Sequence, residues 1–251
     1  GGCDLAVIIA PQSVSGVIRG FSPNLIVQEV EGLKFTSKHV DEVVRTAERF
    51  DCVVVGPGMG VDEEVFEATR LIIERLRGSG KPMVIDADGL KALAGSLDVV
   101  RGANAVLTPH VGEFRLLFGT ILEGSWVEKA LKVKNIAKEQ EVTLLVKAHP
   151  EDVISDGVRV KVNMTGNPAM TVGGTGDVLT GLTASILSKG FSCLRAAAAA
   201  SFICGAAGSL AAEEKGYHIL ATDVIDKIPE VMHRFEPWVK GLSTVLERRR
   251  A

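Results

Sequence analysis

The sequence predicts an α/β fold, with a mostly parallel β-sheet covered by helices, in a single domain spanning residues 1–251. Short and nearly continuous apolar runs, of which residues 4–11 are the first, are typical of parallel strands buried on both faces. They alternate with longer segments that carry apolar residues at helical spacing. A chain of 251 residues, of which 46% are hydrophobic, can bury one large core.

The expected strands follow one another along the chain, and several end in a polar or glycine-containing turn. They cover residues 4–11, 25–30, the start of 51–60, 82–86, 105–108 and 142–147. Residues 151–154 and 158–162 flank Ser155-Asp156-Gly157, a sequence typical of a hairpin turn. The sheet is therefore expected to have an antiparallel extension there.

Helices are expected where apolar residues recur every three or four positions. They cover residues 40–50, 62–77, 90–94, 126–141, 194–215 and 222–231, with further helices starting near Val111 and after Asp177. Residues 196–212 are apolar but consist mainly of Ala, Gly and Ser, which favours a helix buried between close neighbours over a membrane span.

Composition argues against a nucleic acid as partner. A net charge of −3 and 5% aromatic residues provide neither the basic surface nor the stacking platforms of a nucleic-acid-binding protein. The basic run at residues 248–250 is expected to be a solvated tail. Four scattered cysteines without a CxxC pair, and no signal peptide, indicate reduced thiols packed as small apolar residues in a cytoplasmic protein.

The most informative stretch is residues 163–181, NMTGNPAMTVGGTGDVLTG. Gly173, Gly174 and Gly176 precede a helix, whose free N–H groups and dipole form a site for a phosphate or an oxyanion. Asp177 lies at the mouth of this site, where a carboxylate suits a base that deprotonates a hydroxyl during phosphoryl transfer. The alternative is that Asp177 only caps the helix.

Other polar residues follow the expected strands, at the end where open α/β sheets bind ligands. Asp86 and Asp88 follow residues 82–86, and Asp88 could instead cap the next helix. His110 and Glu113 follow a proline turn and can face the same way, and Lys147 ends its strand, where it could pair with a phosphate or be solvated. The GPGMG turn at residues 56–60 lacks the full dinucleotide fingerprint.

Four segments, DCVVVGPGMG, VIDADGL, LTPHVGEF and GNPAMTVGGTGDVLTG, occur in this order. With them the chain resembles the ADP- or ATP-dependent NAD(P)H-hydrate dehydratases of the ribokinase-like superfamily. The resemblance implies a three-layer α/β/α fold and repair of (6S)-NADHX and NADPHX, the hydrated cofactors, to NADH and NADPH. ADP or ATP would phosphorylate the 6-hydroxyl, with ADP giving AMP as the expected route. Phosphate then leaves, and Mg²⁺ is the implied metal.

The resemblance also assigns roles. Asp177 matches the acid that contacts the substrate and activates its hydroxyl, and Gly173, Gly174, Thr175 and Gly176 match the anion hole, with Gly176 also contacting the nucleotide. Substrate contacts match Gly58, Gly60 and His110. The nucleotide segment matches Lys147, Ala148, His149, Pro150 and Glu151. Glu113 resembles the acid of an Asn-x-x-Glu motif that acts on magnesium through water, although His110 stands at the Asn position.

Two departures from the family pattern stand out. Ala148 replaces the usual Gly after the lysine, which could alter the approach of the backbone to the nucleotide. The family's first strand and Gly- and Ala-rich helix, which carries a further substrate contact, have no match, so they are expected to have been removed or to lie elsewhere. The epimerase domain of some relatives is absent too and could be a separate chain or domain.

Three other functions compete with the dehydratase. A related kinase for a sugar or vitamin precursor would release a stable phosphorylated product, although Asp177 disfavours the thiazole type. A nucleotide-sensing module would not need Asp177, and an oxidoreductase would need the complete fingerprint. The choice between ADP and ATP, the preference for NADHX or NADPHX, and the oligomeric state, possibly a homo-oligomer, stay open at this point.

Overall fold

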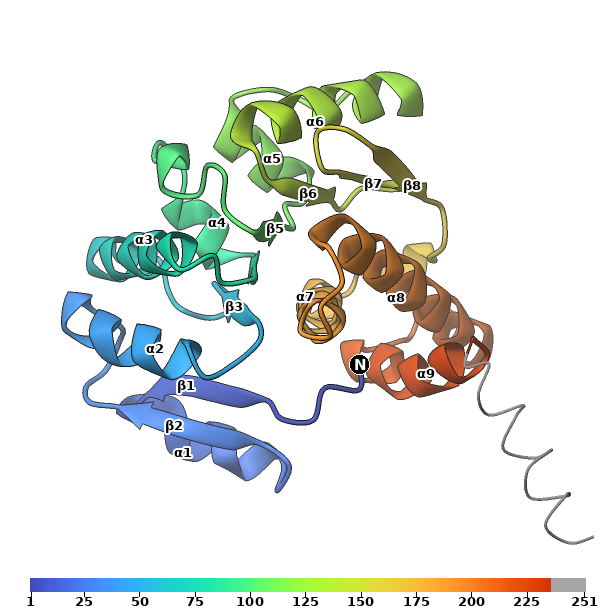
Figure 1. The fold of residues 1–251 in the computed structure, drawn as a ribbon. Coiled ribbons are helices and arrows are strands. Elements are labelled where there is room, and N and C mark those ends of the chain that lie inside the picture. The colour runs from blue at the N-terminus through green and yellow to red at the C-terminus, as the bar shows by residue number, and fades with distance from the viewer. Residues whose placement is uncertain (236–251) are drawn as a thin grey trace, which may run out of the picture.

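The computed structural model describes residues 1–235, so the basic run at 248–250 lies outside the described residues. Its main sheet has six strands in the order β3-β4-β5-β6-β7-β8 (Figure 1). The strands are β3 (Val53–Val55), β4 (Met83–Ile85), β5 (Ala105–Leu107), β6 (Thr143–Val146), β7 (Asp152–Ser155) and β8 (Val160–Asn163). β3 to β6 are parallel, whereas β6, β7 and β8 pair antiparallel. The predicted parallel sheet with a hairpin extension is confirmed.

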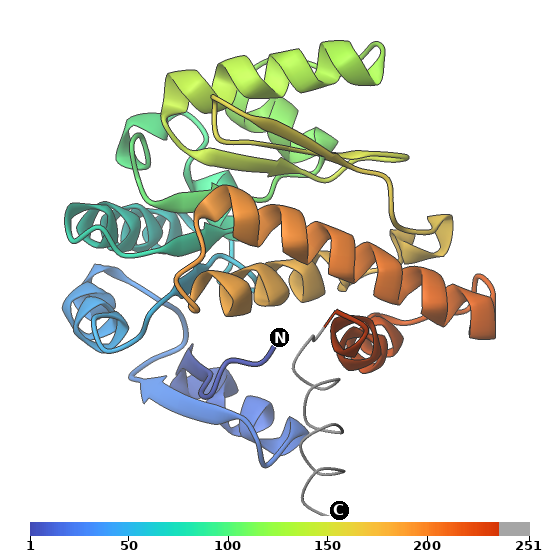
Figure 2. The same ribbon diagram turned by 45° about the vertical axis from the view of Figure 1, so that its right-hand side comes forward.

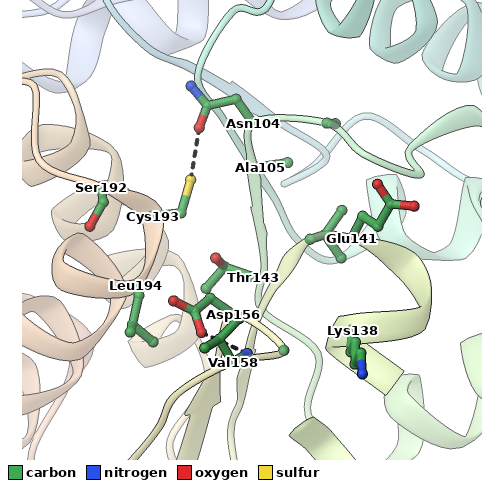
Figure 3. Close-up of a pocket in the computed structure, with 13 residues that line it drawn as sticks. Asn104, Ala105, Lys138, Glu141, Thr143, Asp156, Val158, Ser192, Cys193 and Leu194 are labelled. Atoms are coloured by element: carbon green, nitrogen blue, oxygen red, sulfur yellow. Dashed lines mark hydrogen bonds between the residues drawn. The ribbon is translucent and has the colours of Figure 1, made fainter. Parts of the chain in front are cut away.

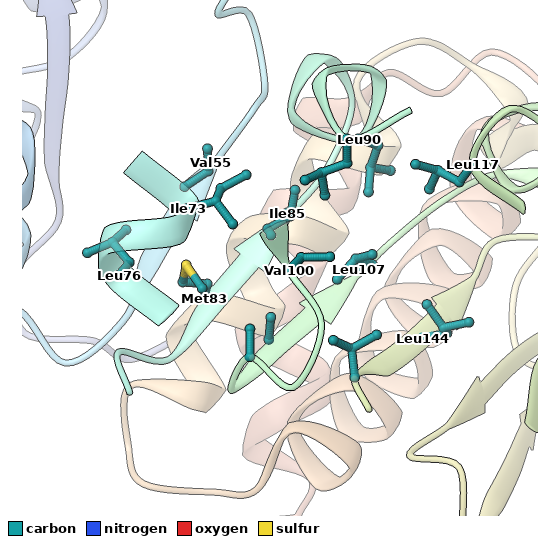
Figure 4. Close-up of a cluster of buried hydrophobic side chains, with 14 of the residues drawn as sticks. Val55, Ile73, Leu76, Met83, Ile85, Leu90, Val100, Leu107, Leu117 and Leu144 are labelled. Atoms are coloured by element: carbon teal, nitrogen blue, oxygen red, sulfur yellow. The ribbon is translucent and has the colours of Figure 1, made fainter. Parts of the chain in front are cut away.

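Helices cover both faces of this sheet, as the alternation of side chains along each strand requires. Met83 and Ile85 of β4 pack into one hydrophobic cluster, shown in Figure 4, whereas Val84 between them packs into a second cluster on the opposite face. The first face is covered by α2 (Val40–Ala47), α3 (Glu63–Gly78), α4 (Asp88–Ala92), α5 (Val111–Phe118) and α6 (Trp126–Gln140). The second is covered by α7 (Thr175–Leu187) and α8 (Cys193–Lys215), with α9 (Ala221–His233) packed against both. The three-layer arrangement predicted for the chain is confirmed.

Helix α8 is long and apolar enough to cross a membrane, and it is the one such helix among residues 1–235. Half of its apolar segment is buried inside the protein, where Ala196, Ala197 and Ala200 are fully covered. Small side chains let α8 lie close to α7, α9 and the sheet. These contacts are those of the buried core helix that its composition predicts.

The four cysteines are free thiols, as predicted. Burial raises the pKa of Cys52 and of Cys204 to about 12, so both thiols stay protonated and behave as small apolar side chains. Cys3 is the exception, because it is exposed.

The first strands form a separate two-stranded parallel sheet of β1 (Val7–Pro11) and β2 (Ile26–Val30) (Figures 1 and 2). The prediction of a first strand buried on both faces is wrong, because Ala10 is the one buried residue of β1. A helix that was not predicted, α1 (Gln12–Phe21), connects the two strands. Short 3₁₀ helices lie at Ser37–His39 (η1), Leu97–Val99 (η2) and Pro168–Thr171 (η3).

Candidate active site

The glycine loop before α7 is held in shape by its polar residues. Asn167 precedes η3, and its side-chain oxygen accepts a hydrogen bond from the Ala169 N–H at 3.0 Å. The Thr175 hydroxyl donates back to the carbonyl oxygens of Met170 at 2.8 Å and Val172 at 3.0 Å. Gly174 adopts φ 92°, a conformation that favours glycine, immediately before the helix. The side chains therefore fix the loop and leave its backbone to contact a ligand.

Helix α7 begins at Thr175, three residues before the predicted start at Val178. The N–H groups of Thr175, Gly176 and Asp177 are thus the first of the helix and have no acceptor within it. Together with the positive end of the dipole of a helix that runs to Leu187, they form an anion-binding end. Anions bind readily at a helix end of this kind, and the role of Gly173, Gly174, Thr175 and Gly176 as an anion hole stays a prediction.

Asp177 does not cap α7, because the cap position is occupied by Gly174. Its side chain is exposed, and it makes no hydrogen bond or ion pair with any residue between 1 and 235. A cap would have placed the carboxylate on N–H groups of its own helix. The carboxylate is instead free to accept a proton from a bound molecule.

Lys147, the residue after β6, reaches the same helix end. Its Nζ lies 2.8 Å from Oδ1 of Asp86 and 3.4 Å from the position that a Cβ on Gly176 would take. Asp86 is 1% exposed, and its Oδ2 accepts a hydrogen bond from the hydroxyl of Thr180, on α7, at 2.6 Å. The buried Asp86 carboxylate thus ties the lysine ammonium to the first turns of α7. A cation held in this place suits a phosphate oxygen.

The glycine turn after β3 packs closely onto the end of β4. A Cβ on Gly56, which has φ 128°, would lie 1.9 Å from the Asp86 carbonyl oxygen, so only glycine fits there. Further along, the Gly60 N–H donates to Oδ2 of Asp88 at 3.0 Å. Asp88 therefore positions the glycine turn, and because α4 begins at Asp88 itself, the capping alternative is wrong.

Asp88 also pairs with Lys91 at 2.8 Å. Its partial burial acts to raise the pKa of the carboxyl, but the hydrogen bonds from Lys91 and the Gly60 N–H outweigh burial and hold the pKa below its usual value. The residue before it, Ala87, has φ 49°, a region unfavourable for a side-chain-bearing residue. Backbone strain of this kind is common at functional sites.

His110 is the N-cap of α5. Its Nδ1 accepts hydrogen bonds from the N–H groups of Gly112 at 2.9 Å and Glu113 at 3.2 Å, while Glu113 Oε2 accepts from the His110 N–H at 3.0 Å. The His110 side chain is still 60% exposed, with Nε2 at 3.6 Å from Glu113 Oε2. The residue is a structural cap whose remaining ring edge can meet a ligand.

The residues around Glu113 do not form a protein cage for a metal. One of its oxygens is already used in the capping box, and within residues 1–235 no group of three His, Cys, Asp or Glu side chains could hold a metal ion. Residues 1–235 therefore offer no dedicated cage of three such ligands. Magnesium commonly keeps several waters and binds through one or two carboxylates and substrate phosphates, and its contact with Glu113 through water stays a prediction.

Residues 147–151 connect β6 to β7. The Ala148 N–H donates to Oδ1 of Asp152 at 3.3 Å, and Oδ2 of Asp152 accepts from Ser201 at 2.6 Å. Burial raises the pKa of Asp152 against the lowering effect of these hydrogen bonds. The Glu151 carboxylate faces Lys129 of α6 at 3.7 Å, and the peptide bond between His149 and Pro150 is cis. Asp152 therefore anchors the backbone at Ala148.

These side chains meet at the carboxyl ends of neighbouring parallel strands. Lys147 follows β6 and forms a β-bridge with His110, which follows β5, and Asp86 follows β4. The Lys147 ammonium lies beside the Gly176 end of α7, and the Gly60 N–H donates to Asp88, whereas the Glu151 carboxylate faces Lys129 of α6. Sequence reasoning did not assign roles to Asp86, Thr180 or Asp152. A polar residue on the buried face of α7 was the signal for Thr180.

A hollow of about 470 Å³ lies at the amino ends of β5 and β6, on the side of the sheet opposite to the glycine loop. Figure 3 shows Asn104, Thr143 and Cys193 in it, with Asn104 accepting a hydrogen bond from Cys193. It shares no lining residue with the glycine loop. The two ends of the sheet are therefore chemically distinct.

A family model described as NAD(P)H-hydrate dehydratase matches residues 1–230. The chain belongs to this family. The bifunctional NAD(P)H-hydrate repair enzyme Nnr of Pyrobaculum aerophilum is 50% identical over 93% of this chain and 46% of its own length. The ADP-dependent (S)-NAD(P)H-hydrate dehydratase of Cenarchaeum symbiosum is 37% identical over 94% of this chain and 80% of its own length.

Solved structures agree on the fold. The ADP/ATP-dependent NAD(P)H-hydrate dehydratase of Bacillus subtilis, co-crystallized with ATP/Mg²⁺, has a TM-score of 0.74 at 24% identity over 94% of this chain and 81% of its own. The hydroxyethylthiazole kinase of Pyrococcus horikoshii has a TM-score of 0.65 at 22% identity, and the match covers 88% of this chain and 86% of the kinase chain. The family member described here spans just under half the length of its bifunctional relative from Pyrobaculum.

Proposed function

We propose that this chain dehydrates (6S)-NADHX and (6S)-NADPHX to NADH and NADPH, using ADP as phosphoryl donor. One observation carries the proposal: the Asp86-held ammonium of Lys147 and the exposed carboxylate of Asp177 flank the same free helix end. Phosphoryl transfer needs a cation and N–H donors on the transferred oxygens and a base on the attacking hydroxyl. This site offers all three within one turn of α7.

In the first step the 6-hydroxyl oxygen of the substrate attacks the terminal phosphorus of the nucleotide. A new O–P bond forms, the bond between this phosphorus and the leaving AMP oxygen breaks, and the hydroxyl proton passes to Asp177. The N–H groups of Thr175 and Gly176 hold the oxygens of the phosphoryl group. In the second step the C6–O bond breaks, phosphate leaves, and loss of a ring proton restores the dihydropyridine.

The two ends of the site are proposed to bind different molecules. Lys147 and the segment Ala148, His149 and Pro150 hold the nucleotide, with Gly176 between the two ligands. Gly58, Gly60 and the exposed ring edge of His110 contact the hydrated cofactor. Glu151 would contact the nucleotide only through its backbone, because its carboxylate faces Lys129.

Magnesium is proposed to enter with the nucleotide. Bound to the phosphates, Mg²⁺ supplies charge neutralisation during the transfer. The protein's own share is Glu113, which would act on it through water. The backbone N–H of His110, which donates to Glu113 Oε2 at 3.0 Å, orients that carboxylate.

We also propose a cytoplasmic location for the protein. Free cysteines with raised thiol pKa values fit a reducing compartment such as the cytoplasm. The epimerase that converts the other hydrate is proposed to be a separate chain or domain, and self-association into a homo-oligomer is proposed as well.

The test incubates the purified chain with chemically hydrated NADH and either ADP or ATP. Recovery of dihydropyridine absorbance, with one AMP released for each NADH formed, is the expected result. Release of nucleoside monophosphate or diphosphate together with a stable phosphorylated organic product would assign the site to a small-molecule kinase. Absence of nucleotide turnover with both donors would overturn the proposal.

A further inference from the structure

Helix α8 holds two segments of the site that are separate in the chain. Ser201 of α8 is 1% exposed, and its hydroxyl donates to Oδ2 of Asp152 at 2.6 Å, where the segment that follows Lys147 ends. At the next residue of α8, the Phe202 carbonyl oxygen accepts a hydrogen bond from the Thr165 hydroxyl at 3.1 Å. Thr165 lies between β8 and the glycine loop. The same helix therefore contacts the proposed nucleotide segment and the approach to the glycine loop.

Two glycines of α8 let the second segment lie close to the helix. A Cβ on Gly205 would lie 2.4 Å from Oγ1 of Thr165 and 2.7 Å from its carbonyl oxygen, so a larger residue does not fit there. One turn further along α8, the Met170 side chain packs against Gly208. The chain from Thr165 to Met170 is thus seated on α8 just before the free end of α7.

Asp152 connects the two segments. Its Oδ1 accepts a hydrogen bond from the Ala148 N–H at 3.3 Å, and Asn163 stands directly opposite Asp152 in the pairing of β7 with β8. Opposed side chains of antiparallel strands lie on the same face, and hydrogen bonding from Asn163 acts to lower the pKa of Asp152. The Asn163 Oδ1 in turn accepts from the N–H of Thr165 at 3.2 Å and from its hydroxyl at 2.8 Å. Hydrogen bonds therefore run from Ala148 through Asp152 and Asn163 to Thr165.

The two connected segments have different tasks in the proposed reaction. Residues 147–151 hold the nucleotide, whereas the loop after Thr165 leads to the helix end that receives the transferred phosphoryl group. Phosphoryl transfer needs these two parts in a fixed relation, because a misplacement of about 1 Å can cost about a hundredfold in rate. Both oxygens of Asp152 are already engaged by Ala148 and Ser201, so the carboxylate acts on the reaction through position.

We propose that Asp152 is a positioning residue for phosphoryl transfer, whose carboxylate holds the nucleotide segment and the glycine loop in register on α8. The inference rests on the proposed function for the identity of the two ligands. It differs from a purely structural role, in which Asp152 stabilises the β7–β8 hairpin and its loss changes the unfolding temperature alone.

Amide hydrogen exchange in the full chain without ligands tests the connection directly. In Asp152→Ala, exchange should become about tenfold faster at Ala148 and in residues 165–171, and stay unchanged in α3. Ser201→Ala leaves the carboxylate in place, removes its bond to α8 and should speed exchange in the same two segments. It also serves as the test if Asp152→Ala does not fold. Ser209→Ala is the matched control, because Ser209 is a half-buried serine of the same helix. Faster exchange at Ala148 alone would overturn the proposal.

Kinetics provides a readout that a purely structural role would not change. Asp152→Ala should raise KM for ADP and lower kcat, each about tenfold. The KM for hydrated NADH should stay unchanged, because its proposed contacts, Gly58, Gly60 and His110, follow other strands. Thr165→Val cuts the connection only on the loop side, so it should lower kcat and leave KM for ADP near that of the wild type.

The double variant Asp152→Ala/Thr165→Val separates a shared pathway from two independent effects. Its kcat should be no lower than that of Asp152→Ala, because both substitutions break the same connection. Additive losses, or a lowered unfolding temperature with unchanged kcat and KM, would overturn the proposal. A wild type without nucleotide turnover would instead contradict the proposed function, and the hydrogen exchange would still decide whether Asp152 connects the two segments.

Discussion

The Lys147 ammonium lies 2.8 Å from the buried carboxylate of Asp86, and the two residues come from the ends of β6 and β4. Asp86 also accepts a hydrogen bond from Thr180, so this one carboxylate contacts both the Lys147 ammonium and the helix that bears Asp177. We expect Asp86→Asn to weaken nucleotide binding by about the same factor as Lys147→Ala, since each variant removes the same positioned cation.

Calorimetric titration of ADP against both single variants and the double variant tests this coupling. If the two residues act as a unit, the double variant binds no more weakly than either single variant. Asp98→Asn is the control, because Asp98 is exposed and far from this network. Additive losses in the double variant would show that Asp86 and Lys147 act separately.

Lys147→Ala should weaken nucleotide binding more than it slows the chemical step. A cation that contacts phosphate in both the ground state and the transition state contributes mainly to uniform binding. Losing one charge-assisted hydrogen bond costs about 1.5–3 kcal/mol, or roughly ten- to hundredfold in the dissociation constant. Steady-state kinetics with varied nucleotide checks it, with Lys161→Ala, on the exposed face of β8, as the matched control. Unchanged affinity with collapsed turnover would contradict the assigned role.

His110 has two separable roles, a cap of α5 and a proposed substrate contact. His110→Ala should lower the free energy of unfolding by roughly 0.5–2 kcal/mol through loss of the cap, and raise KM for the hydrated cofactor about two- to tenfold. His110→Ser restores a good cap but not the ring. We therefore expect the serine variant to unfold like the parent while keeping the raised KM. A normal KM in the serine variant would leave His110 as a cap alone.

The lowered pKa of Asp88 makes part of the stability depend on pH. A carboxyl whose pKa is lower in the folded state stabilises the fold above its unfolded pKa, and this contribution is lost as the pH falls through the folded pKa. The difference in unfolding free energy between wild type and Asp88→Asn should therefore be present at pH 7 and vanish below the ordinary Asp range of about 4. Chemical denaturation at several pH values measures it. A pH-independent difference would show that charge is not the cause.

Much of the main sheet could be predicted from the sequence because its strands are buried on both faces. Residues such as Met83 and Val84 belong to opposite layers, yet both are apolar, so the strand reads as a continuous hydrophobic run. The glycine loop was also predictable, because Gly174 and Asn167 are of residue types that favour turns and loops. Helix α1 escaped prediction although its apolar residues recur at helical spacing, because Gly16 and Gly20 weaken helical signals and no side chain caps its start.

The side-chain partners of the site could not be predicted in the same way. Thr180 and Asp86 are far apart in the chain, and only the packing of α7 on β4 brings them together. Asp88 illustrates a local ambiguity: the sequence is compatible with a helix cap, whereas the structure uses its carboxylate to hold Gly60. Such choices depend on tertiary geometry that no short motif specifies.

Asp177 is proposed to be the base that takes the hydroxyl proton, and the substitution Asp177→Asn tests this role. Asparagine keeps the shape of the exposed side chain but removes its basic oxygen, so turnover should fall about a hundredfold or more. ADP binding and the unfolding temperature should stay near those of the wild type, because Asp177 has no partner within residues 1–235 and does not cap α7. The measurement is the steady-state dehydratase rate on hydrated NADH alongside ADP binding by calorimetry. We expect lost turnover with intact ADP binding, and near-normal turnover in the variant would show that Asp177 is not the base.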